Sequence, residues 1–292
     1  MIFSTNRRGV VLMVTAMACY ALNDALVKLT LHAFPAGQVL LMRGLLASTL
    51  LMAISWRHAG GPSAAGDTSA LWHPLLALRC LLEVTTAITS VLALSQASLA
   101  LVSAIMMTAP LLIAAASMTL GWERPHPRLL GGVALGLAGA LLVLRPTPQS
   151  SSAGLTLAGL CAVSLAARDM VTRRLPSSMP SSLVAALTTC SVCAVAPVFS
   201  WAMGESWVSP ARPEAIAVSA AAGCAAVGNY ALVAACRDAD LSVVTPFRYS
   251  LIVWASLVGF MVWGDVPDAL NLAGIAIIAT AGVVTLRAAA RR

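Results

Sequence analysis

Long runs of hydrophobic residues follow one another along almost the whole chain, and most charged residues stand between these runs. A helix needs about 20 mostly apolar residues to cross a bilayer, and lipid leaves the backbone no outside hydrogen-bond partners, so such spans are α-helical. The pattern predicts ten transmembrane helices, over residues 9–31, 36–56, 73–95, 98–120, 129–145, 154–173, 182–202, 214–236, 240–262 and 268–287.

Polar residues inside the runs indicate an internal repeat. Asn23-Asp24-Ala25-Leu26-Val27-Lys28 in the first predicted span resembles Arg168-Asp169-Met170-Val171-Thr172-Arg173 in the sixth, because each has an acid followed four residues later by a cation. These segments coincide at an offset of 145 residues, and residues 99–145 match the second half at an offset of 142. We therefore predict two repeats, residues 1–147 and 148–292, with five spans each.

An odd number of spans per repeat turns the second repeat upside down in the membrane. Inverted repeats are typical of secondary transporters, in which two equivalent halves move around a site near the bilayer midplane. The expected fold class is an all-α membrane protein with ten helices in two inverted five-helix repeats. In this arrangement Asp24 lies in the outer half of the bilayer and Asp169 in the inner half.

Charge supports a membrane protein and sets its orientation. Only 10% of the residues are charged, against about 25% in soluble domains. Eleven Lys and Arg residues fall on the side of the N-terminus and three on the other, so the positive-inside rule predicts an inner-membrane protein with both termini in the cytoplasm. The net charge of +7 is spread over helix ends, which argues against a nucleic-acid partner.

The candidate chemistry includes neither a metal nor a cofactor. The four histidines lie in loops or at segment ends, and the seven cysteines fall in apolar runs, where they are expected to pack as small apolar residues. A glycine-rich phosphate-binding loop is also missing from the sequence. We expect a small-molecule substrate and the lipid bilayer as partners; proton coupling, and a monomer or a homodimer, stay open.

The chain resembles the drug/metabolite transporter superfamily, in particular permeases with two EamA-type domains. The resemblance implies ten helices around a central cavity and the export or import of small polar metabolites. It extends over nearly the whole chain. The residues that carry it are Asn23-Asp24-Ala25-Leu26-Val27-Lys28, Leu41-Met42-Arg43-Gly44, Leu78-Arg79, Ala109-Pro110-Leu111, Gly121-Trp122-Glu123-Arg124, Thr245-Pro246-Phe247-Arg248-Tyr249-Ser250 and Trp263-Gly264-Asp265-Val266-Pro267.

Charged residues inside the predicted spans are the main candidates for function, because burying them in a membrane is costly. The four arginines and three acids leave a cationic excess that suits a substrate with carboxylate groups, which guanidinium groups bind with two parallel hydrogen bonds. Arg248 follows Pro246, a helix-breaking residue, and is the first candidate for a substrate ligand. The seven charged residues are Arg43, Arg79, Arg168, Arg248, Asp24, Glu83 and Asp169.

Two interpretations stay open for the closely spaced charges. Glu83 stands one helical turn after Arg79, so it either binds a substrate ammonium or a coupling proton, or forms a structural ion pair. The pairs Asp24–Lys28 and Asp169–Arg173 are likewise either ion pairs near helix ends or parts of two alternating gates, with Arg168 assigned to the inner gate. Other polar and aromatic residues of the spans are assigned to the substrate site: Asn23, Tyr249, Asn229, Tyr230, Tyr20 and Trp254.

Glycines at matching positions of the fifth and tenth spans predict close packing of these two helices as a scaffold, with a dimer face as the alternative. The favoured function is an inner-membrane secondary transporter that exports a small carboxylate-bearing, amino-acid-like metabolite, such as an amino acid or a metallophore, by alternating access. The alternative from the same fold is an importer of S-adenosylmethionine-like or nucleotide-like metabolites. A remote alternative is an intramembrane enzyme, but the short loops hold no cluster of histidines and acids at ligand spacing.

Overall fold

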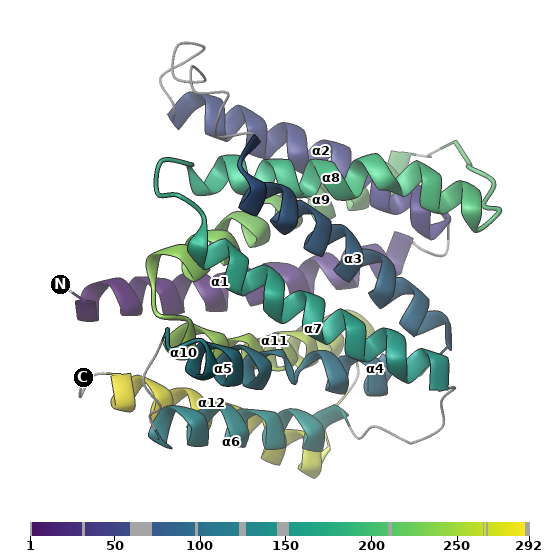
Figure 1. The fold of residues 1–292 in the computed structure, drawn as a ribbon. Coiled ribbons are helices and arrows are strands. Elements are labelled where there is room, and N and C mark those ends of the chain that lie inside the picture. The colour runs from purple at the N-terminus through teal and green to yellow at the C-terminus, as the bar shows by residue number, and fades with distance from the viewer. Residues whose placement is uncertain are drawn as a thin grey trace.

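A computed structural model describes residues 2–30, 33–58, 72–96, 99–122, 127–144, 152–209, 212–264, 266 and 268–289, and in these ranges the regular elements are all helices (Figure 1). The helices are α1 (Ile2–Thr30), α2 (Ala36–His58), α3 (Pro74–Gln96), α4 (Leu99–Met106), α5 (Ala109–Thr119), α6 (Pro127–Leu144), α7 (Ser152–Arg174), α8 (Ser181–Ala202), α9 (Arg212–Asp238), α10 (Leu241–Val244), η3 (Thr245–Tyr249), α11 (Ser250–Trp263) and α12 (Ala269–Ala289).

Six segments of the described chain are helices long and apolar enough to cross a membrane, and they lie in α1, α2, α7, α8, α9 and η3–α11. Shorter apolar helices occupy α5, α6 and α12, and α3 has 23 residues, which also suffices by length. The predicted all-α fold with helices at the ten expected places is therefore confirmed.

Two of the predicted spans are broken. The predicted span 98–120 contains α4 and α5, which are separated at Met107 and Thr108 just before Pro110. Residues 240–262 form α10, the 3-10 helix η3 and α11, and Pro246 lies in the first turn of η3. Proline removes one backbone donor and clashes with the preceding turn, which accounts for the interruption expected at Pro246.

The helix packing is nearly symmetric between the two halves of the chain. Replacing each helix by its counterpart in the other half gives nearly the same set of packed pairs. α1 packs against α9, and α3 packs in the same way against α7, which are the equivalent elements of the opposite halves. In the pairs α2–α8 and α6–α12, each helix packs against its own counterpart in the other half. This symmetry is what an internal repeat produces, and the division at residues 147 and 148 stays a prediction.

The first helices of the two halves run in opposite directions. Asn6, near the start of α1, donates a hydrogen bond to Asp240 at 3.1 Å, and Arg173, near the end of α7, lies 3.7 Å from the same carboxylate. In Figure 1 both chain termini lie at this end of the molecule. Asp24 and Asp169, the matching acids, therefore lie towards opposite ends, as an inverted repeat requires.

Glycines bring α6 and α12 into close contact, as the sequence suggested for the fifth and tenth spans. A Cβ atom built on Gly139 would lie 2.8 Å from the carbonyl oxygen of Gly274, and a Cβ atom on Gly274 would lie 2.8 Å from the carbonyl oxygen of Gly139. Backbone atoms cannot move aside as a side-chain end can, so neither position has room for a side chain. The two helices thus form a scaffold within one chain.

We expect Gly139→Ala to lower the free energy of unfolding by about 1–3 kcal/mol, because the added methyl group overpacks the contact with α12. Gly131 lies on the same helix with no neighbour within 4 Å of a built Cβ atom, so Gly131→Ala is the matched control. The control should be neutral or gain up to about 1 kcal/mol. Thermal unfolding of the purified proteins in detergent would show the difference, and equal melting temperatures would contradict the packing argument.

Candidate functional site

Glu83 joins α3 to α7 through two arginines. Arg79, one turn earlier on α3, donates a hydrogen bond from Nη1 to Oε2 of Glu83. Arg168 on α7 places its Nη1 at 3.3 Å from Oε1 and 3.4 Å from Oε2 of the same carboxylate. The expected Arg79–Glu83 ion pair is therefore present, but it is part of a contact between two helices rather than a pair within one.

Asp169 joins α7 to η3 in a similar way. The Nε of its neighbour Arg168 donates to Oδ1 at 3.0 Å, and Nη1 of Arg248 donates to Oδ2. The Asp169 side chain is only 1% exposed. Each of its carboxylate oxygens thus has a guanidinium partner, one on its own helix and one on the broken segment around Pro246.

A threonine completes this arrangement. Arg79 donates from Nε to the Thr172 hydroxyl at 2.6 Å, and Thr172 donates to the carbonyl oxygen of Arg168 at 2.7 Å. Thr172 is missing from the residues selected by sequence, although it lies one turn after Arg168 on the same face of α7. That spacing was the one signal that could have revealed it.

We call Arg79, Glu83, Arg168, Asp169 and Arg248 the ionic cluster. Its three arginines are at most 5% exposed, and they contact carboxylates in the protein interior instead of lipid. Three guanidinium groups and two carboxylates leave one positive charge. Buried ions are stable only when they are paired, so the cluster has the charge of a site that accepts an additional anion.

Arg43 lies outside the ionic cluster and binds α1. Its Nη1 donates to Oδ1 of Asn23 at 3.1 Å, and Asn23 donates from Nδ2 to Oδ1 of Asp24 at 2.9 Å. Arg43 is therefore linked to Asp24 through a buried amide. The side chain of Lys28, expected to pair with Asp24, lies outside the described residues.

A second polar chain crosses from α1 to α8. The Tyr20 hydroxyl donates to Oδ1 of Asn229 at 2.5 Å, and Nδ2 of Asn229 donates to the Thr189 hydroxyl at 2.9 Å. Gly228 lies against the Tyr20 ring, where a built Cβ atom would approach the ring to 3.2 Å. Tyr20 and Asn229, both selected from the sequence, are thus brought together, while Thr189 was not foreseen.

Three aromatic candidates are not brought to the ionic cluster. Tyr249 is fully buried among apolar residues of α6, α11 and α12, and its hydroxyl has no hydrogen-bond partner among the described residues. Tyr230 is 37% exposed on α9. Trp254 is partly buried and packs on the apolar core that includes α1 and α9. Their assignment to a substrate site stays a prediction.

The expected pair of Asp169 and Arg173 needs correction. Arg173 lies 3.7 Å from Asp240 and donates from Nη1 to the carbonyl oxygen of Arg237, while Asp169 pairs with Arg168 and Arg248. One helical turn brings two side chains within reach of each other, but the arginine at the end of α7 has its partners in the last turn of α9 and in the loop that follows it.

Hydrogen-bonded clusters lie at both ends of the helix bundle. At the end of the chain termini, Arg237 donates to the carbonyl oxygens of Met179 and Pro176, next to the Asn6–Asp240–Arg173 contacts. At the opposite end, Glu205 accepts from the backbone of Gly37 at 2.9 Å and from Ser200 at 2.7 Å. There the Gln38 side chain bonds both backbone groups of Val208.

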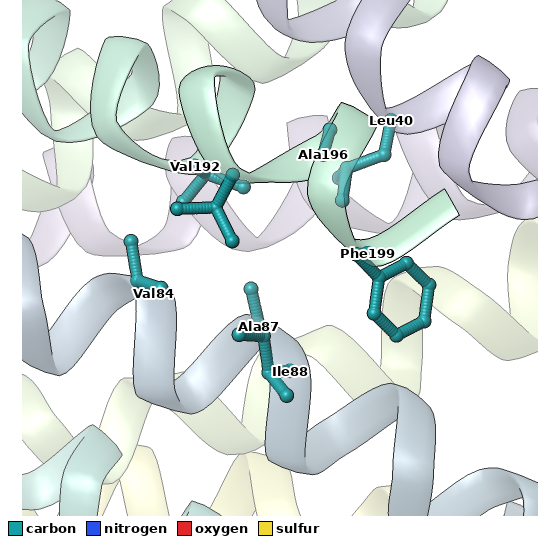
Figure 2. Close-up of a pocket in the computed structure, with 8 residues that line it drawn as sticks. Leu40, Val84, Ala87, Ile88, Val192, Ala196 and Phe199 are labelled. Carbon is teal, nitrogen blue, oxygen red and sulfur yellow. The ribbon is translucent and has the colours of Figure 1, made fainter. Parts of the chain in front are cut away.

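An apolar pocket lies between α2, α3 and α8 (Figure 2). Val84, Ala87 and Ile88 line it from α3, along the same helix as Glu83, and its cavity volume of about 10 Å³ is close to the space that one water molecule needs. Side chains of α8 and Leu40 of α2 form the other walls. The pocket offers hydrocarbon contacts beside a helix that also carries charged residues.

Comparison with known proteins assigns the chain to a class. Residues 7–145 match the EamA-like transporter family. Over these residues the chain is similar to that family. The expected resemblance is thereby confirmed, and the match ends close to the predicted boundary of the first repeat.

Relatives and solved structures extend the likeness of this EamA-like chain to its whole length. The chain is 25% identical over 289 residues to the pseudopaline exporter CntI of two Pseudomonas aeruginosa strains, UCBPP-PA14 and PAO1, and the alignment covers 98% of this chain and 99% of the relative. A solved crystal structure with 21% identity superposes with a TM-score of 0.83, over 97% of this chain and 99% of the other. Together with the long apolar helices, this likeness to transporters indicates a multi-pass membrane protein.

Proposed function

We propose that the protein is an inner-membrane secondary transporter that exports a small, carboxylate-bearing, amino-acid-like metabolite. The observation that carries this proposal is the ionic cluster, in which three buried arginines face only two carboxylates. A substrate with a net negative charge would complete the charge balance. Arginine is well suited to this role because its planar donors bind carboxylates with two parallel hydrogen bonds.

Alternating access would use the two closed ends of the bundle. The contacts of Arg237 and Asp240 would close the end with the chain termini, and the excess of basic residues favours the cytoplasm for this end. The contacts of Glu205 and Gln38 close the periplasmic end. Opening one end while the other stays closed would expose the ionic cluster to each side in turn.

The direction of transport is proposed from the relatives. Proteins named as pseudopaline exporters match the chain along its full length, which favours export of a metallophore-like compound over import of S-adenosylmethionine-like or nucleotide-like compounds. A proton gradient is one energy source for such transport.

Transport by purified protein in liposomes tests this proposal. Counterflow of labelled pseudopaline, glutamate and S-adenosylmethionine should show exchange of at least one of the first two compounds and none of the third. Liposomes without protein are the control for leakage, and inside-out compared with right-side-out vesicles give the direction. Exchange of S-adenosylmethionine alone would favour the importer and overturn the proposed substrate class.

A further inference from the structure

We propose that the head group of an amino-acid-like substrate inserts between Asp169 and Arg248, with its carboxylate on Arg248 and its ammonium on Asp169. This inference rests on the proposed function and specifies which atoms of the site receive the substrate. Before insertion the two side chains are in direct contact, and both are almost completely buried. After insertion each keeps a partner of opposite charge, so no ion is left unpaired in the interior.

A bond from Arg168 keeps the Asp169 carboxylate in place while the head group inserts. Arg168 holds Oδ1 through its Nε at 3.0 Å, independently of Arg248. Insertion therefore breaks only the bond to Oδ2, and an ammonium group can take the released oxygen. The zwitterionic head group leaves the charge of the ionic cluster unchanged, so the surplus positive charge remains for a further carboxylate of the substrate.

The Asp169–Arg248 pair lies where binding of the head group would move η3 relative to α7. Asp169 lies on the regular helix α7, and Arg248 lies on η3, between α10 and α11. A short 3-10 segment inside a longer helix is often a hinge. Because the two side chains touch, a head group can enter only when α7 and η3 separate. Binding at this pair would thus shift the broken helix relative to α7.

The pair has no counterpart in the other half of the chain. Asp24 is the equivalent of Asp169, but it accepts a hydrogen bond from Asn23 at 2.9 Å. The equivalent of Arg248 at the offset of 142 residues is Met106, which has no charge. The repeat therefore provides a single pair of this kind, and a single head-group site follows from it.

Thermal stabilisation by small ions tests the insertion without any need to know the natural substrate. Asp169→Ala leaves Arg248 without its carboxylate, so sodium acetate should raise the melting temperature of this variant, and methylammonium chloride should not. Arg248→Ala leaves Oδ2 of Asp169 free, so the effects of the two probes should be reversed. Glycine, which carries both groups, should stabilise the wild-type protein.

The expected increase is roughly 3 to 6 °C for a probe at about ten times its dissociation constant. Sodium chloride at equal ionic strength is the control for unspecific salt effects, and Asp238→Asn is the control variant, since its carboxylate is exposed at the end of α9. Asp169→Asn, which keeps the side-chain size, and Arg248→Gln, which keeps a polar but uncharged side chain, give the same crossed pattern if the alanine variants do not fold.

Equal responses of both variants to acetate and methylammonium, or no response of either variant, would overturn the insertion. The result is independent of the counterflow experiment. A crossed pattern without transport of any carboxylate compound would retain the head-group site and reject the proposed function. Transport of such a compound without the crossed pattern would retain the function and reject this site.

Discussion

We expect Arg248→Ala to reduce transport strongly but to leave the protein folded in the membrane. Removing this guanidinium reduces the ionic cluster from three cations and two anions to two of each, and Asp169 keeps Arg168 as a partner. No buried charge is stranded, so the fold should tolerate the change. The loss of a charged contact in a buried site costs about 2–5 kcal/mol, which corresponds to roughly a thirtyfold to several-thousandfold decrease in transport.

Initial rates in liposomes at equal protein amount measure this effect. Arg174→Ala is the matched control, because it also removes one arginine, and Arg174 stacks at 3.9 Å on the ring of Trp122 at the exposed end of α7. We expect the control to transport at a rate close to that of the wild type. Full activity of Arg248→Ala would exclude this arginine from the substrate site.

The members of the ionic cluster could be predicted from the sequence because charge inside a membrane span is costly. Arg79, Glu83, Arg168, Asp169 and Arg248 were all selected for this reason, and the structure brings these five together. The selection did not depend on knowing which helices are neighbours. A buried charge is stable only beside a partner of opposite charge. The few charged residues of a long apolar chain are therefore expected to form ion pairs with one another in the folded protein.

The choice of partner within the site could not be predicted. Helical spacing indicated Asp169 with Arg173, but Asp169 pairs with Arg168 and Arg248, the second of which is 79 residues away. Spacing along one helix is visible in the sequence, whereas contacts between α7 and η3 depend on packing of the whole bundle. Thr172 and Thr189 were missed for a related reason, because uncharged hydroxyl groups are common in apolar helices and carry no strong signal.

The repeat predicted more of the packing than of the chemistry. Exchange of the halves relates α1–α9 to α3–α7, which follows from matching glycines and acids in the two halves. The polar contacts do not follow this symmetry. The ionic cluster lies on α3, α7 and η3, while the equivalent positions in the opposite half hold residues such as Met106. The proposed function therefore rests on positions where the two halves differ.

Glu83→Gln should strongly destabilise the protein, because two arginines lose their shared carboxylate. Arg79 and Arg168 both donate to Glu83, and each is at most 5% exposed. Removing one partner of a buried ion pair costs about 3–5 kcal/mol, since the remaining charge has no water to solvate it. A fall of roughly 10 °C in melting temperature is expected for a chain of this size.

A second substitution distinguishes an ion pair from a proton carrier. Arg79→Met in the Glu83→Gln background removes the surplus cation and keeps an apolar stem, so it should restore a large part of the lost stability, although the same change in the wild-type background should destabilise. If Glu83 carried the coupling proton instead, Glu83→Gln would fold normally and transport would lose its dependence on pH. The double-mutant cycle and a pH profile of transport together decide between the two interpretations, because a structural pair predicts coupling between the substitutions and a proton carrier predicts none.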